Sequence, residues 1–350
     1  MYATEDDLMT GYFMMFLNWI NGMVGNYGWS IVVFTLIIRL ILLPLDIKSK
    51  KSMRAMTKIQ PKMAALQQKY ANDRDKLNQK MSELYRKEHV SPMSGCLPML
   101  IQMPILFIMF AAMRTVGNER TISMILGMKE TGALADGVLQ PWLWIKNVFM
   151  PDSFSATILP PVGDALRMIQ PSKTSAILTQ ENIDAARAFL ASDAYNAIAV
   201  NYAPAVAFTT IRIPLLFANP TIMLPTSFAN LMQYSNGLFI LPLLAGASQF
   251  LMTQIMNGKQ KDKDKDPNAV PTVQQKQADD AAAAANAMNS PMMKWFFPIF
   301  SIWICATSNA AFSIYWMAAN VIQIVQQLAV NAWFERQDAK AEAQGTPTDK

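Results

Sequence analysis

The apolar residues of this 350-residue chain fall into blocks, and the charged residues stand between the blocks. Five blocks are about as long as a helix must be to cross a bilayer, for which roughly 20 residues suffice. They cover residues 28–45, 96–116, 238–256, 292–307 and 311–330. Such segregation is typical of a multi-span membrane protein and is unusual in a soluble enzyme. We therefore predict an all-α polytopic membrane protein with five transmembrane helices.

Charge is distributed unevenly among the segments that separate these blocks. Residues 46–95 hold twelve Lys and Arg residues against five acids, whereas no Lys or Arg precedes Arg39. Basic loops stay in the cytoplasm by the positive-inside rule. We therefore predict that 46–95 is cytoplasmic and that 1–27 is external. The alternation then places 117–237 outside, and the linker 257–291 and the tail 331–350 inside.

The basic segment 46–95 has the pattern of a helical hairpin. The dipeptide Asn72-Asp73 should separate its two helices, with Asp73 as an N-cap. Pro61 lies within the first helix and should kink or restart it. Such a hairpin can rest on anionic lipid, and its methionines can also adapt to the apolar surface of a nascent chain.

The external segments carry weaker signals. Residues 1–27 predict a helix lying in the membrane interface, with a short span as the alternative. In 117–237, Trp142 and Trp144 suggest an interfacial aromatic anchor, and 180–195 has helical spacing. Residues 203–224 are apolar but rich in proline, so we predict an interfacial loop there, with a sixth span as the alternative.

One cation, Arg39, lies inside the first apolar block, and Thr35 shares its helix face one turn earlier. A charge at that depth costs about 2.5–3.5 kcal/mol on insertion scales. Arg39 could reach the nearer interface or pair with an acid elsewhere. The interpretation that we favour is a wet, polar cavity built around Arg39.

No motif in the chain points to covalent chemistry. Cys96 and Cys305 both lie in apolar blocks and are expected to be core residues rather than a disulfide. His89 stands alone, without the spacing of metal ligands. A phosphate loop, a nucleophile elbow and a zinc motif are all absent from the sequence. We expect no enzyme activity, no metal and no cofactor.

Several stretches together resemble the YidC-type membrane protein insertases, the bacterial relatives of the mitochondrial and chloroplast insertases. They are GNYGWSIVVFTLIIRLILLPLDIKSKKSMRAMTKIQPKMAALQQKY, ELYRKEHVSPMSGCLPMLIQMPI, LFILPLLAGASQFLMTQIM and SIYWMAANVIQIVQQ. The resemblance covers all five spans and the cytoplasmic hairpin. It departs at residues 154–236, which are far longer than the family's connection. It also departs at the turn 308–311, where members usually have a Pro-Gly-containing turn.

The resemblance implies an insertase and chaperone of the bacterial cell membrane, with its N-terminus outside and its C-terminus in the cytoplasm. It implies that Arg39 lies in a hydrophilic groove that receives the polar segments of nascent membrane proteins. The candidate residues lining the groove or its rim are Thr35, Gln102, Gln249, Thr253 and Trp316. An interhelical hydrogen bond is the alternative role for Gln102, Gln249 and Thr253, and packing is the alternative for Trp316.

The implied partners are nascent membrane proteins and the lipid bilayer, with the ribosome and the Sec translocon left open and no nucleic acid bound directly. Two other classes compete with the insertase. A secondary transporter typically shows internal repeats, and none is visible between the halves of this chain. A receptor could use the long external region for a ligand, but it would not need a buried cation together with a basic hairpin.

Overall fold

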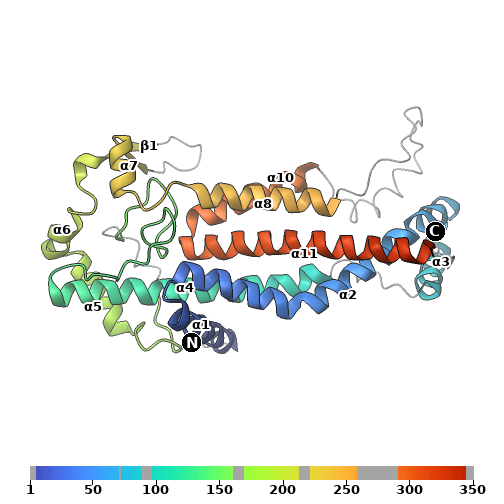
Figure 1. Cartoon of the computed structure of the whole chain (residues 1–350), viewed down its shortest axis with the longest axis horizontal. Helices are drawn as coiled ribbons and strands as arrows, with labels where there is room; N and C mark the ends of the chain where they lie inside the picture. The colour runs from blue at the N-terminus through green and yellow to red at the C-terminus, as the bar shows by residue number, and fades with distance from the viewer. Residues whose placement is uncertain are drawn as a thin grey trace. The chain divides into compact units, whose positions relative to one another are not determined.

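The structure, a computed structural model, describes residues 5–70, 72–88, 97–160, 169–212, 221–257 and 291–343. These residues form mostly helix, and they divide into two compact units that are described separately below (Figure 1). Five long helices have residues in both units: α2 (Tyr27–Lys69), α4 (Leu97–Thr131), α8 (Ile240–Asn257), α10 (Pro291–Thr307) and α11 (Ala310–Ala343).

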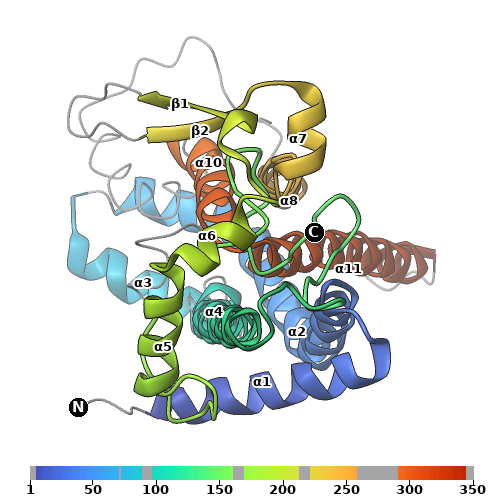
Figure 2. The ribbon, with the colours of Figure 1, turned by 90° about the vertical axis from the view of Figure 1, so that its left-hand side faces the viewer.

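The first unit contains the external region of the sequence prediction and the helix ends that adjoin it. Its own elements are α1 (Glu5–Val24), α5 (Gln180–Leu190), α6 (Asp193–Ala199), the 3-10 turn η3 (Ala205–Ala207), β1 (Phe208–Arg212), β2 (Thr221–Pro225) and α7 (Phe228–Tyr234). Figure 2 shows α5 lying against the end of α4.

The external region has a hydrophobic core of its own. Ile122, Ile125 and Met128 on the last turns of α4 pack with Ile183 and Phe189 on α5. The hydroxyl of Tyr195 is buried beside this core and donates to the carbonyl of Pro160 at 2.5 Å. Burial raises the pKa of Tyr195 to about 12, because the charged phenolate would lose its water. The region is therefore a folded cap on α4.

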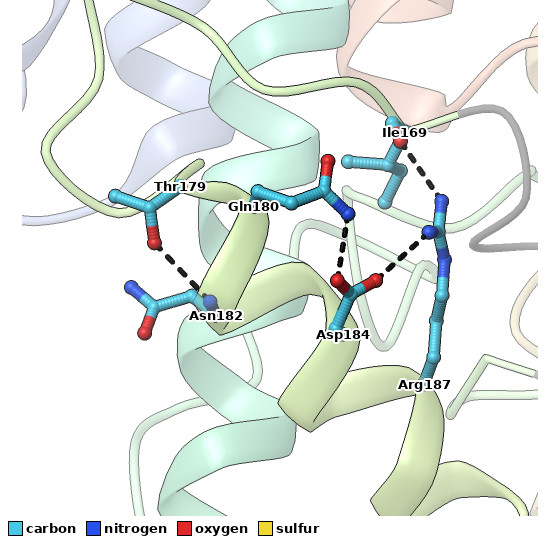
Figure 3. A network of polar contacts seen from close by, with 6 residues as sticks. All are labelled: Ile169, Thr179, Gln180, Asn182, Asp184 and Arg187. Carbon is cyan, nitrogen blue, oxygen red and sulfur yellow. Dashed lines mark hydrogen bonds and ion pairs between the residues drawn. The ribbon is translucent and has the colours of Figure 1, made fainter.

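Helix α5 begins where the sequence provides a cap. The hydroxyl of Thr179 accepts the N–H of Asn182, as an N-cap residue does. On the outer face, Asp184 accepts from Gln180 and from Arg187, and Arg187 also donates to the carbonyl of Ile169 (Figure 3). The helical spacing predicted for 180–195 is confirmed, with one break because Ser192 caps a second helix, α6.

Two predictions for the external region are wrong. Residues 203–224 form no simple loop, because β1 pairs antiparallel with β2, with Phe208 opposite Pro225 and Arg212 opposite Thr221. The prolines suggested a loop, but β2 ends at Pro225, where a missing N–H is tolerated. Trp142 does not fit the predicted aromatic anchor, since it is 5% exposed and packs on Gly28, where an added Cβ would lie 2.2 Å from its ring, whereas Trp144 is half-buried.

The helices are longer than the apolar blocks. Helix α2 continues through positions 44 and 61 to Lys69, so of the two effects predicted for Pro61, a kink or a restart, the restart does not occur. Helix α4 runs on to Thr131 and stops before Gly132, whose φ of +71° suits glycine. Helix α11 continues into the predicted tail as far as Ala343. The hydropathy pattern therefore predicted where each apolar segment ends, but it did not predict where each helix ends.

The turn that departs from the family pattern is closed by Asn309. Helix α10 ends at Thr307 and α11 begins at Ala310, as the predicted tight turn requires. The Asn309 side-chain oxygen accepts the N–H of Phe312 at 3.0 Å, which is an N-cap bond. An asparagine cap therefore starts α11. Cys305, just before this turn, is buried as predicted, and Cys96 lies outside the described residues.

The second unit contains α3 (Arg74–Lys87) and the adjoining lengths of α2 and α11. Asp73 caps α3 by accepting the N–H of Lys76, which confirms the predicted break and cap, and this hydrogen bond lowers the pKa of Asp73. The hairpin of α2 and α3 is joined by an ion pair from Lys62 to Glu88 at 2.7 Å.

The end of α11 is bound to the basic half of α2. The guanidinium of Arg54 lies 4.6 Å from the ring centroid of Phe334 and pairs with Asp338 at 2.5 Å. Phe334 is buried, whereas the side chains of Arg54 and Asp338 are 38% and 50% exposed, so the ion pair itself faces water. The charged residues after 331 therefore include a helical segment that packs on α2.

Candidate substrate-binding site around Arg39

Helix α2 carries the two residues that the sequence placed on one face. Thr35, in the first unit, is 1% exposed, and its hydroxyl donates to the carbonyl of Ile31 at 2.6 Å. This bond along the helix satisfies the hydroxyl hydrogen and leaves an oxygen lone pair for another donor. Arg39 follows one turn later, in the second unit, with 6% of its surface exposed.

The side chain of Arg39 contacts an amide on α11. Its Nη2 donates to Oε1 of Gln323 at 3.2 Å, and Nε2 of Gln326 donates to the Arg39 carbonyl at 3.2 Å. Gln323 is neutral, so this contact binds the guanidinium without cancelling its charge. Asp46, two turns further along α2, lies close enough to interact electrostatically with Arg39. The partners of the buried cation thus include the neutral amide of Gln323.

The pair Gln323 and Gln326 was missed as part of the site. Both lie on α11 three positions apart and therefore on one face of the helix. The signal was available, because two amides so spaced in an apolar span must find polar partners. Gln326 keeps an unsatisfied acceptor, since its buried Oε1 has no hydrogen-bond partner in the described part of the chain.

Of the other residues predicted to line the groove, Thr253 and Trp316 contact residues of their own helices. Thr253 donates to the carbonyl of Gln249 at 2.9 Å, a bond within α8 rather than between helices. Gln102 belongs to α4, but its side chain lies outside the described residues. Trp316 is half-buried, and its ring lies 5.6 Å from that of Phe312. Its indole N–H is buried, with no hydrogen-bond partner among the described residues.

An interhelical hydrogen bond of the expected kind occurs at another pair. In the first unit, Nδ2 of Asn320 on α11 donates to the hydroxyl of Ser248 on α8 at 3.1 Å. Asn320 is 8% exposed, so the bond is shielded from water. Ser248, one position before Gln249, thus makes an interhelical hydrogen bond of the kind considered for Gln249 and Thr253.

The long helices expose apolar side chains on their outer faces. Among the described residues, one helix segment, Tyr27–Met56, is long and apolar enough to cross a bilayer by length and composition. Two shorter apolar helices cover Ile240–Ile255 and Trp295–Thr307. Large exposed apolar residues on these helices and on α11 include Leu40, Ile41, Leu243, Leu251, Ile299, Trp303, Val321, Val325 and Leu328. Surfaces of this kind are suited to lipid.

A buried arginine bonded to amides, on a helix with an apolar outer face, defines the class: a helical membrane protein with a polar site in its apolar region. Within that class the family can be stated. The chain matches the family described as "60Kd inner membrane protein" over residues 19–338, and it belongs to that family.

Relatives in three bacteria share part of the chain. A protein of Fusobacterium nucleatum is 47% identical over 109 residues, 31% of this chain and 53% of its own length. A Bordetella pertussis protein is 34% identical over 44% of this chain and 28% of its length. An Ectopseudomonas mendocina protein is 40% identical over 43% of this chain and 23% of its length. Each is named membrane protein insertase YidC, and the chain spans between about a quarter and about half of the length of these relatives.

Proposed function

We propose that this protein is a membrane protein insertase of the bacterial inner membrane that receives polar client segments at Arg39. The observation that carries the proposal is the buried guanidinium of Arg39, bonded to the neutral amide of Gln323 in an apolar helix. A cation inside an apolar helix is costly, and such residues commonly mark functional sites in membrane proteins. The names of the relatives support the same function.

The mechanism follows from exchange of one hydrogen-bond partner for another. A client's short acidic tail would displace Gln323 and pair transiently with the positive charge of Arg39. The client's apolar segment would meanwhile move into lipid, where its burial drives the step. The membrane potential adds about 2.3 kcal/mol per elementary charge per 100 mV for an acidic tail moving outward. No covalent step is required.

The other predicted residues take supporting roles in this proposal. Thr35 offers a hydroxyl oxygen on the Arg39 face, and Trp316 offers an indole N–H that has no hydrogen-bond partner among the described residues. Gln102, Gln249 and Thr253 are proposed to line the path of the client. Five spans around this path, an interfacial N-terminal helix and cytoplasmic placement of 46–95, 257–291 and 331–350 complete the proposed architecture.

The outer face of α1 supports its place in the membrane interface. Met15 and Trp19 are more than half exposed on one face, whereas Leu17 and Ile20 are buried on the other. A helix that exposes large apolar residues in this way is suited to the boundary between lipid and water. We propose that α1 lies along the outer surface of the bilayer.

The test of the function is crosslinking from the amide that binds Arg39. A photo-crosslinking residue at Gln323 should capture the polar tail of a stalled single-span client. The same residue at Val321, two positions away and exposed, serves as the control because it faces another direction on α11. Capture that is equal at 321 and 323, or absent at both, would contradict a client path beside Arg39.

The topology predicts a second result. Asn72 is exposed in the turn between α2 and α3, so a cysteine placed there is accessible to reagents. An impermeant thiol reagent should leave it unlabelled in intact cells and label it once the membrane is opened. A cysteine at position 200, exposed in the region proposed to be external, should be labelled in intact cells and also after the membrane is opened. Labelling of position 72 from outside would overturn the proposed orientation.

A further inference from the structure

Large apolar side chains are exposed just before the β1–β2 hairpin and on α7. Val206 is 85% exposed, just before β1, and Phe228 on α7 is 75% exposed. Met232, four positions after Phe228 and on the same face, is 49% exposed. A cluster of such residues at one place marks an interaction site, whereas scattered ones need no explanation.

An apolar cavity opens beside these residues. It measures about 460 Å³, a size within the range of about 300–1,000 Å³ typical of ligand pockets. Its walls come from β2, from α7, from the residues that precede α8 and from Phe154. The lining residues are Phe154, Leu224, Pro225, Ser227, Phe228, Leu231 and Leu238. Six of these seven are apolar, so the cavity is suited to a hydrocarbon group.

Helix α7 is held close to the beginning of α8. It ends at Tyr234, and α8 begins at Ile240 (Figures 1 and 2). The ammonium of Lys146 donates to the carbonyls of Gln233 and Ser235, at 2.7 and 2.9 Å. These bonds tie the last turn of α7 to the segment that contains Lys146.

The apolar face continues onto α8 itself. Leu243 and Leu244, in the first turns of α8, are 54% and 42% exposed. If α8 enters the bilayer at this end, as its apolar composition requires, the cavity and the α7 face lie at the outer membrane surface. Lipid is then the partner that meets both surfaces at once.

We propose that the cavity and the exposed face of Val206, Phe228 and Met232 form a binding surface for acyl chains of the outer leaflet. This surface anchors the cap to the membrane and lies outside the path proposed for clients. The proposal requires only that α8 spans the bilayer, so it stands or falls separately from the role of Arg39.

The test uses single cysteines in the full-length chain, with Cys96 and Cys305 replaced by alanine. Each cysteine carries an environment-sensitive fluorophore, and the protein is placed in phosphatidylcholine–phosphatidylglycerol bilayers containing lipids with nitroxides on their acyl chains. F228C and M232C should lose fluorescence to an extent comparable with L244C on α8. V200C, an exposed apolar position at the end of α6, should keep its fluorescence.

Each outcome decides between the alternatives. Quenching at 228 and 232 that matches 244 supports the lipid surface. If 228 and 232 behave like 200 while 244 is quenched, the proposal is wrong although α8 is in the membrane. If 244 is also unquenched, α8 does not span as required and the proposal fails with it. Crosslinking of unquenched position 228 to a client's apolar segment would assign the surface to clients instead.

Discussion

Replacing Arg39 by alanine is expected to slow the insertion of a client whose translocated tail is acidic, while the protein still folds. A hydrogen bond to a charged group contributes about 1.5–3 kcal/mol. Losing such a bond in the rate-limiting encounter slows the step by about tenfold to a hundredfold. A basic tail gains nothing from Arg39, so its insertion should be unchanged. The buried cation is costly, and its removal should not destabilise the protein.

Other substitutions at position 39 separate charge from shape. Arg39→Lys should retain much of the activity, because a point charge suffices where two-pronged geometry is not required. Arg39→Glu should be the most defective with an acidic tail, because like charges repel. Gln323→Ala is the matched control, since it removes the partner of Arg39 and leaves the cation. It should keep the preference for acidic tails.

The measurement is insertion of one reporter with an acidic, neutral or basic tail by each variant, normalised to the amount of protein in the membrane. The charge mechanism predicts that the effect of Arg39→Ala depends on the sign of the tail. Equal insertion of all three tails by wild type and by Arg39→Ala would assign Arg39 a structural role. Equal slowing of all three would point to damage to the fold.

The features that sequence predicted best depend on neighbours along the chain. Asp73 caps α3 by accepting the N–H of Lys76, three positions away, as predicted. The burial of Arg39 also follows from its place among apolar residues, and the structure has it 6% exposed. Short-range rules of this kind need no knowledge of which helices meet.

Contacts between distant segments were beyond those rules. Gln323 is 284 positions from Arg39, and the pattern of α11 shows a polar face without showing which helix it meets. The pairing of β1 with β2 was likewise not predicted. Strands of five residues give only a weak alternation of apolar and polar residues, and the prolines in 203–224 indicated a loop. Helix α2 also continues through Pro61, because a helix of 43 residues tolerates the loss of the backbone hydrogen bond that one proline removes.

Asp152 is the clearest case of a residue whose role depends on distant contacts. It is 0% exposed, and its Oδ1 accepts the N–H groups of Leu238 and Phe239 at 2.8 and 3.1 Å. Its Oδ2 accepts the N–H of Leu241 at 2.6 Å. The carboxylate thus caps α8 from another segment, where the positive end of the helix dipole favours an anion. It closes the base of the external cap onto α8.

Replacing Asp152 by alanine is therefore expected to lower the free energy of unfolding by about 3 kcal/mol or more. Each buried donor left unsatisfied costs about 1–3 kcal/mol, and three N–H groups of the α8 start lose their acceptor. Asp152→Asn should be milder, because one oxygen acceptor remains while the amide NH₂ faces an N–H group. Gly237→Ala should resemble Asp152→Ala, since an added Cβ would lie 2.0 Å from Oδ1 of Asp152.

The measurement is thermal and denaturant unfolding of the purified full-length protein in one detergent, with proteolysis of the external cap as a second readout. Asp184→Ala is the matched control, because that carboxylate is 57% exposed and its pair with Arg187 lies on the surface of α5. An exposed pair contributes about 0–1 kcal/mol, so this variant should unfold almost like wild type. If Asp152→Ala and Asp184→Ala unfold alike, the buried carboxylate does not hold the cap to α8. If Asp152→Ala alone makes the external cap more sensitive to proteases, the hydrogen bonds between Asp152 and the start of α8 are what hold this region in place.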